Sequence, residues 1–309
     1  IYVQFRRFYS CSVSCCNCIR YCVSRSCNRI NRKINKPFVL CDFSPPKGGN
    51  PDLLADANEL TPDMFMVAYA PGNSVRVNPI FVAEWIQNKT KVPSMFAIST
   101  RDENKRAIQS LLLGAELKDL RNLLVVAGDK SVDGHLSMQV DMKYSGPTEL
   151  IASIKAMNDR RDYQGKPLIY PTRFCVGAAL DLSRGWENEV RLTKAKVDQG
   201  CDFMISQPVF DINLPHKFLS FYKDSIGENL NVPIMWGIQM VEKNTVSFAA
   251  VPEWLYQELE NGRLAHEITI DLIRQYREIG IETFYLIPTV FKGGRRDYVS
   301  AQAVIEEVG

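Results

Sequence analysis

Histidine is scarce in this sequence, and the common nucleotide-binding and hydrolase motifs are missing. The 309 residues include His135, His216 and His266, and none of these follows a predicted strand, which argues against a histidine metal centre. No G-x-G-x-x-G sequence follows the first predicted strand, and neither a G-x-x-x-x-G-K-[ST] loop nor a G-x-S-x-G elbow occurs. These absences argue against a Rossmann dinucleotide site and exclude a P-loop and a serine-hydrolase elbow.

Long apolar runs and a large excess of one charge are lacking as well. No apolar run approaches the roughly 18–20 residues that a membrane span requires, and the formal net charge is only +2. The composition, 46% hydrophobic and 23% charged, is typical of a globular protein. We therefore expect a cytoplasmic protein with no membrane and no nucleic-acid partner.

Cysteine is concentrated at the start of the chain. Six of the nine cysteines lie between positions 11 and 27, in a stretch rich in Arg, and the first acidic residue is Asp42. A disulfide cluster, a metal site and an organellar targeting peptide are alternatives, but a paired C-x2-C pattern, a nearby His and an apolar core are all missing. We interpret residues 1–35 as a non-barrel extension that is disordered or non-native. Cys41, Cys175 and Cys201 have apolar neighbours and are expected to be reduced core thiols.

From Lys36 onward, apolar runs of strand length alternate with amphipathic helical patterns. The runs are apolar almost throughout, as expected of parallel strands that are buried on both faces. They are Phe38–Phe43, Met64–Ala70, Ser94–Thr100, Leu123–Gly128, Arg173–Leu180, Phe203–Gln207, Pro233–Gln239 and Thr283–Pro288. Eight such units predict an α/β fold of the (β/α)8 TIM-barrel class over residues 36–309, with a doubly wound open sheet as the alternative. The final helical pattern is Arg296–Val308, and Glu242–Arg263 is a long insertion with its own helical piece, Pro252–Leu259.

Polar side chains recur where the predicted strands end, which in a barrel is the side of the active site. Asp42, Asp129, Gln207 and Gln239 occupy such positions. Asp102, Asp181 and Asp211 precede helical patterns and are also explained as helix caps. The segment from Lys292 to Arg296 fits either a phosphate-binding turn or a solvated one.

At these strand ends the sequence resembles the methylenetetrahydrofolate reductase family. The matching segments are Asp42-Phe-Ser-Pro-Pro-Lys-Gly, Leu111 to Asp129, Val176-Gly-Ala-Ala, Lys196 to Asp211, and Gly237-Ile-Gln-Met-Val. They occur in the family's order and spacing over essentially residues 37–309. The resemblance implies an oxidoreductase of one-carbon metabolism that uses non-covalent FAD and NADH or NADPH to reduce 5,10-methylenetetrahydrofolate to 5-methyltetrahydrofolate, for methionine biosynthesis.

The resemblance also implies roles for individual residues. Asp42 falls on the catalytic acid that helps to open the folate ring, and Asp129 on a carboxylate that contacts the flavin and stabilises the cationic iminium. Gln207 falls on a pterin-binding amide, and Gln239 is expected to bind substrate beside it. The predicted cofactor-binding residues are Asp129, Gly177, Ala179, Glu189 and Lys196, and no metal is expected. An acid of this kind must hold its proton near neutral pH, which requires a desolvated carboxyl with a raised pKa.

This sequence departs from the family pattern at four positions. Asp42 replaces a Glu, Ala68 stands where a Thr is frequent, Ala97 replaces a flavin-contacting His, and Ala195 replaces an Arg. Three of these departures, at Asp42, Ala97 and Ala195, leave open the alternative of a non-catalytic folate- or flavin-binding barrel that serves as a partner subunit. A lyase or aldolase barrel would require a Lys at a strand end or a metal cluster, and the predicted strands offer neither. A homo-oligomer and a separate electron-donor subunit both remain open.

Overall fold

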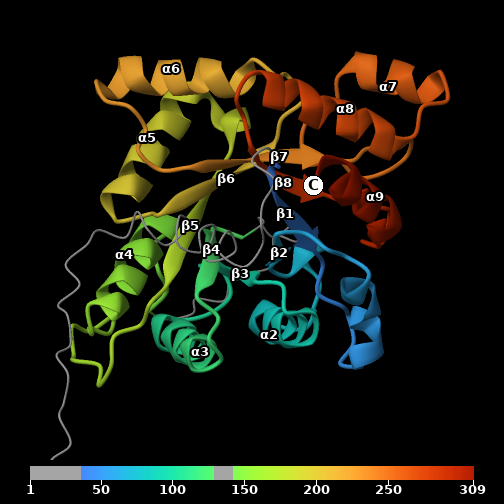
Figure 1. The fold of residues 1–309 in the computed structure, drawn as a ribbon. Helices are drawn as coiled ribbons and strands as arrows, with labels where there is room; N and C mark the ends of the chain where they lie inside the picture. The colour runs from blue at the N-terminus through green and yellow to red at the C-terminus, as the bar shows by residue number, and fades with distance from the viewer. Residues whose placement is uncertain (1–35, 129–141) are drawn as a thin grey trace, which may run out of the picture.

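All eight predicted strands form, and they pair in chain order around a closed barrel (Figure 1). The computed structural model describes residues 36–128 and 142–309; the extension 1–35 and Asp129 lie outside the described residues. Each neighbouring pair of strands is parallel, and β8 pairs with β1 to close the barrel, with Leu40 opposite Tyr285. The strands are β1 Phe38–Phe43, β2 Met64–Val67, β3 Ser94–Ser99, β4 Asn122–Val126, β5 Cys175–Leu180, β6 Phe203–Pro208, β7 Ile234–Gln239 and β8 Thr283–Ile287.

Helices surround the barrel and connect successive strands (Figure 1). They are η1 Pro51–Asn58, η2 Pro71–Asn73, α2 Pro79–Thr90, α3 Lys105–Leu117, α4 Pro147–Asn158, η3 Leu182–Arg184, α5 Trp186–Asp198, α6 Leu214–Ile226, α7 Glu253–Glu260, α8 Ala265–Glu278 and α9 Tyr298–Val308. Local sequence explains several of their starts, because the side chains of Asn78, Asn104 and Asp297 accept hydrogen bonds from backbone N–H groups of the first turns. The predicted (β/α)8 class is therefore confirmed, and the open sheet is wrong.

Alternate residues of each strand face two different cores. The larger core lies between the strands and the helices and includes Phe65, Phe96 and Phe284. The smaller core fills the barrel interior with Leu40, Met66 and other large side chains. The interior is packed rather than open, so ligands can reach the barrel only at its ends.

Two sequence predictions need comment here. The last helix begins at Tyr298 and not at Arg296, because Arg296 forms an antiparallel bridge with Val290 and Asp297 caps the helix. Cys41, Cys175 and Cys201 are buried, as expected, and burial raises the pKa of the Cys201 thiol to about 12. No helix in the described parts of the chain has the length and apolar character needed to span a bilayer.

Candidate functional site

Asp42 lies at the carboxyl end of β1, buried at the mouth of the barrel with 2% of its surface exposed. Both of its carboxylate oxygens are engaged. The hydroxyl of Tyr285, on the neighbouring strand β8, donates to Oδ1 at 2.7 Å, and Nε of Arg296 donates to Oδ2 at 3.1 Å. We call these three residues the Asp42 cluster.

Charge and burial act together in the Asp42 cluster. Burial, followed by the charge of Asp42, raises the pKa of Tyr285 well above its usual value, so this hydroxyl keeps its proton. Burial lowers the pKa of the Arg296 guanidinium, but the charge and hydrogen bond of Asp42 help to make the net shift upward. The cluster therefore contains a neutral phenol and a guanidinium, and both donate to one carboxylate.

The chain segment after β8 places Arg296 in this cluster. Phe291 donates its N–H to the carbonyl of Arg295 at 2.9 Å, and Gly293 and Gly294 adopt φ values of +90° and +89°, which favour glycine. The resulting turn reverses the chain and returns Arg296 to the barrel mouth. The glycines predicted for a phosphate site thus have a local structural use, and Arg296 binds a carboxylate of the protein itself.

Gln207 on β6 is exposed and borders a groove beside the barrel mouth, and its contact with a ligand stays a prediction. The groove has a volume of about 480 Å³, within the range of small-molecule sites. Its walls include the aromatic side chains of Trp186, Phe210, Phe248 and Trp254. We call it the β6 groove. The ring of Phe248 also lies 5.9 Å from the guanidinium of Arg296, so the groove and the Asp42 cluster adjoin.

The side chain of Gln239, on β7, forms hydrogen bonds with the loop that follows this strand. Its Nε2 donates to the carbonyl of Val246 at 2.7 Å, and its Oε1 accepts from the N–H of Phe248 at 2.9 Å. The residue is buried, with 2% of its surface exposed. The structure therefore places Gln239 where it fixes the loop that carries Phe248 to the groove, and its substrate-binding role stays a prediction.

The predicted cofactor residues of β5 differ in accessibility. Ala179 is partly exposed near the end of the strand, whereas Gly177 is buried in the barrel interior. A Cβ atom at Gly177 would lie 2.1 Å from the ring of Phe203. Packing against Phe203 therefore explains why position 177 is a glycine.

Glu189 and Lys196 lie on the buried face of α5, behind the end of β5. Nζ of Lys196 donates to the carbonyl of Ala179 at 2.7 Å and lies 3.4 Å from Oε1 of Glu189. Glu189 has no exposed surface, and its Oε2 has no hydrogen-bond partner among residues 36–128 and 142–309. Burial lowers the pKa of Lys196, and the charge of Glu189 opposes that shift. The pair is thus a buried polar group beside β5.

The other acidic residues at strand ends have local roles. Asp181 caps η3 by accepting from the N–H of Ser183 at 3.1 Å, which confirms a capping role. Asp211 accepts from the N–H of Asn213, one residue before α6. Asp102 forms an ion pair with Arg101, and Asn104 caps α3 in its place. Among residues 36–128 and 142–309, no group of three or more potential ligands could hold a metal ion.

Two residues of the site were missed by the sequence-based prediction, Tyr285 and Arg296. Tyr285 was read only as an apolar strand residue, although a Tyr that faces the barrel interior needs a partner for its hydroxyl. Arg296 was assigned to a turn and to the start of a helix. Their sequence distances from Asp42, 243 and 254 residues, kept them from being considered together.

Comparison with known proteins finds the same family by a family model and by individual relatives. A family model described as methylenetetrahydrofolate reductase matches residues 28–287. Methylenetetrahydrofolate reductase 2 of Schizosaccharomyces pombe is 21% identical over 224 residues, which are 66% of this chain and 33% of that protein. Methylenetetrahydrofolate reductase (NADH) 1 of Arabidopsis thaliana is 23% identical over 210 residues, 65% of this chain and 34% of that protein. The chain thus spans about a third of the length of the curated relatives it matches.

A solved structure shares the fold. It is a protein from Clostridium thermocellum that binds two copies of 5-methyl-5,6,7,8-tetrahydrofolic acid, with a TM-score of 0.60 and 16% identity, and the match covers 93% of this chain and 97% of that one. At this identity the likeness establishes the fold alone, whereas the family model covers most of the chain. On the match of that model, the chain belongs to the methylenetetrahydrofolate reductase family.

Proposed function

We propose that this barrel reduces 5,10-methylenetetrahydrofolate to 5-methyltetrahydrofolate, with FAD as the bound cofactor and NADH or NADPH as the reductant. The observation that carries the proposal is the buried carboxylate of Asp42 at the barrel mouth, next to an aromatic groove, in a chain of this family. The folate-binding protein from Clostridium thermocellum, which has the same fold, supports a folate as the ligand.

The β6 groove suits the flat rings of a folate. Aromatic walls stack on planar heterocycles, and the exposed amide of Gln207 supplies both a donor and an acceptor at the rim. The bound methylene carbon must become electrophilic before it can accept hydride. Opening of its five-membered ring produces a cationic iminium, which a nearby carboxylate stabilises. Asp42 adjoins the groove, where it would act as the acid for ring opening, and stabilisation of the iminium by Asp129 remains a prediction.

The residues beside β5 are compatible with a flavin. Glu189 Oε2 is a buried acceptor that finds no partner in the described part of the chain, and a hydroxyl of the flavin side chain would satisfy it. Lys196 would supply a positive charge near the flavin phosphates, and the small Ala179 leaves space at the strand end. When bound, FAD supplies the hydride chemistry, and the protein positions it relative to the substrate. Gly177 would assist only indirectly, by accommodating Phe203.

The second candidate function is a barrel that binds folate without reducing it and serves as a partner subunit. The observation in its favour is Ala97, which gives the end of β3 an apolar side chain that packs in the barrel interior. It differs from the first proposal in a measurable way, because a partner subunit would bind 5-methyltetrahydrofolate but would not reoxidise a reduced flavin.

The test uses the full chain. We expect the purified protein to be yellow, to release FAD on denaturation, and to be reduced anaerobically by NADH or NADPH and reoxidised by methylenetetrahydrofolate. Chromatography of the released cofactor and stopped-flow absorbance measure these steps. A colourless protein that does not bind added FAD would contradict the flavin assignment. A reduced flavin that methylenetetrahydrofolate leaves unchanged would favour the partner-subunit function.

A further inference from the structure

Arg76 is a cation at the barrel mouth whose hydrogen-bond partners are all neutral. It lies in the loop after β2, where its Nε donates to the carbonyl of Pro71 at 3.2 Å and to Oγ of Ser74 at 3.1 Å, and its Nη1 donates to the carbonyl of Pro45 at 2.8 Å. No carboxylate in the described part of the chain pairs with this guanidinium. Its positive charge is therefore fixed in position and is not neutralised locally.

The glycine turn after β8 packs directly on the guanidinium of Arg76. Gly294 has a φ of +89°, and a Cβ atom at this position would lie 2.7 Å from Nη2 of Arg76. The turn also carries Lys292 and Arg295, which are exposed and form no ion pair with the described residues. Two loops that are far apart in the sequence thus bring three cations without carboxylate partners to one side of the mouth.

The acidic residues of the adjoining segments are already engaged. Asp42 binds Arg296 at 3.1 Å, and Asp297 caps α9 by accepting from the N–H of Ser300 at 3.1 Å. Burial, followed by the charge of Arg296, lowers the pKa of Arg76, so two guanidinium groups act on each other in this region. A local excess of positive charge at a ligand entrance attracts anions.

We propose that Arg76, together with Lys292 and Arg295, forms a subsite for an oxyanion of the bound ligand, either a carboxylate of the glutamate tail of folate or a phosphate of the nicotinamide nucleotide. We call these three residues the Arg76 subsite. The inference rests on the proposed function, which supplies both ligands. A guanidinium presents its N–H groups in a planar fork that matches carboxylate and phosphate oxygens. Nη2 of Arg76 forms no hydrogen bond with the described residues, so it is an available donor.

The position of the Arg76 subsite suits the charged end of a ligand whose rings lie elsewhere. The subsite belongs to the loops after β2 and β8, whereas the β6 groove lies at the ends of β5, β6 and β7. Arg296 lies between them, because its guanidinium is 5.9 Å from the ring of Phe248 in the groove and its charge acts on Arg76. A ligand with its rings in the groove beside Asp42 would extend its charged end toward Arg76.

Matched ligands test the Arg76 subsite by binding to the full chain, without turnover. 5-Methyltetrahydrofolate and 5-methyltetrahydropteroate have the same rings, but only the first carries the glutamate carboxylates. NADP⁺ carries phosphates that its two halves, adenosine and nicotinamide riboside, lack. Isothermal titration calorimetry of each ligand with wild type and Arg76→Gln gives the affinities.

The expected effect is selective for the ligand that carries the oxyanion. Arg76→Gln should weaken its binding by about 10- to 100-fold, as expected for the loss of a charge-assisted hydrogen bond. Binding of the counterpart without the oxyanion should not change. Arg76→Lys, which keeps the charge and loses the fork, should weaken binding less than Arg76→Gln. The double variant Lys292→Gln with Arg295→Gln should weaken binding by about two- to tenfold, because solvent screens exposed charges.

The pair that responds identifies the anion. A loss confined to 5-methyltetrahydrofolate assigns the subsite to the tail carboxylates, and a loss confined to NADP⁺ assigns it to a phosphate. Arg160→Gln is the matched control, since Arg160 is an exposed arginine at the amino end whose Nε also donates to a neutral carbonyl, that of Leu168, at 3.2 Å. This variant should bind every ligand as wild type does.

Several results would overturn the Arg76 subsite. These are wild-type affinity in Arg76→Gln, an equal loss for ligands with and without the oxyanion, an equal loss in Arg160→Gln, and a wild type that binds neither oxyanion-bearing ligand. If Arg76→Gln does not fold, the exposed double variant decides, and wild-type affinity in it overturns the subsite. A wild type that binds these ligands but does not reduce methylenetetrahydrofolate would overturn the proposed function alone.

Discussion

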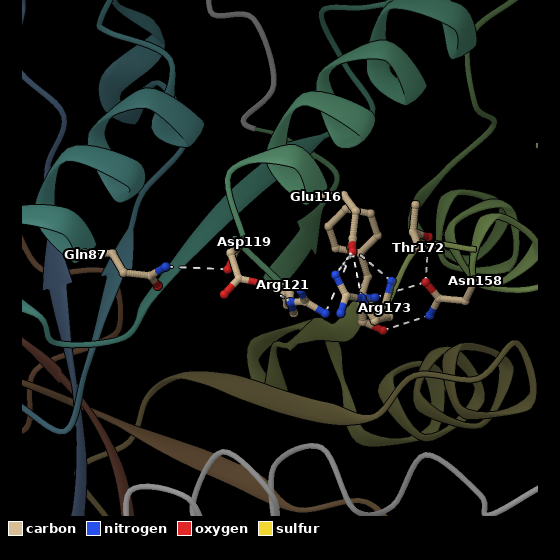
Figure 2. Close-up of polar contacts among 8 residues, drawn as sticks. Gln87, Glu116, Asp119, Arg121, Asn158, Thr172 and Arg173 are labelled. Carbon is tan, nitrogen blue, oxygen red and sulfur yellow. Dashed lines mark hydrogen bonds and ion pairs between the residues drawn. The ribbon is translucent and has the colours of Figure 1, made fainter. Parts of the chain in front are cut away.

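The two ends of the barrel use the same kinds of charged residues in different surroundings. At the amino end, the carboxylate of Glu116, at the end of α3, accepts from the backbone N–H of Arg173 at 3.0 Å and from its Nε at 2.8 Å, and Arg121 lies nearby (Figure 2). The side chain of Arg173 is 62% exposed, whereas that of Arg296 at the carboxyl end is 3% exposed. Solvent weakens the first ion pair and leaves the second strong.

These two ion pairs thus differ in their exposure to solvent, and the proposed function uses the buried one. The amino-end contacts tie the loop before β4 to the loop before β5, and Asn158 joins them by bonding Thr172 and Phe174 (Figure 2). Residues at the amino end of a (β/α)8 barrel usually contribute to stability. The Asp42 cluster lies at the opposite end, where ligands can enter, and holds its charge away from water.

The largest effect is expected from Asp42→Asn. This variant should slow the folate half-reaction at least on the order of 10²-fold and leave FAD binding and flavin reduction by nicotinamide intact, because only the folate step develops charge beside Asp42. Stopped-flow measurement of each half-reaction provides the comparison. Asp162→Asn, which removes the charge of an acidic residue that accepts from the backbone N–H groups of Gln164 and Lys166, is the control. Folate reduction by Asp42→Asn at the wild-type rate would remove Asp42 from the mechanism.

The next effect concerns packing inside the barrel. Gly177→Ala should destabilise the protein by about 1–3 kcal/mol, because the added methyl group clashes with the ring of Phe203. The double variant Gly177→Ala with Phe203→Leu should recover part of that loss. Gly114→Ala, in α3 with no atom within 4 Å of the new methyl group, should be neutral or stabilising by up to about 1 kcal/mol. Denaturant unfolding measures all three, and equal effects of the two single variants would refute the packing explanation.

A comparable effect on stability, with no effect on rate, is expected at the amino end. Asn158→Ala removes two hydrogen bonds to the backbone of Phe174 and one from Thr172, and it should cost about 1–3 kcal/mol of unfolding free energy. The rate of folate reduction per folded molecule should not change. Asn88→Ala is the matched control, since Asn88 is exposed and its side chain donates to the side chain of Glu84. A slowed folate step in Asn158→Ala would show that the two ends are coupled.

The smallest effect is expected from deleting residues 1–35. The sequence of this stretch lacks the apolar periodicity of a barrel element, and β1 begins at Phe38. The melting temperature and the turnover rate should both match those of the full chain. A large fall in either value would mean that the cysteine-rich segment contributes to the working protein.

The sequence by itself determined the number and order of the strands. Each of the eight segments is apolar on both faces, and the pattern depends only on local composition, so all eight were predicted to within a few residues. Several helix starts were equally local, since Asn104 and Asp297 cap helices through bonds to residues three positions away. Asp42 was identified because an acidic residue at a strand end is visible in the sequence alone.

Only the tertiary structure decided what surrounds Asp42. Closure of the barrel places β8 beside β1 and so brings Tyr285 within 2.7 Å of Asp42. A glycine turn then returns Arg296 to the same carboxylate. Likewise, the amide of Gln239 is used by the loop that follows it, and Gly177 is required by a ring on the next strand. These pairings depend on contacts between distant residues, and local sequence patterns do not specify them because burial and charge pairing are set only when the barrel closes.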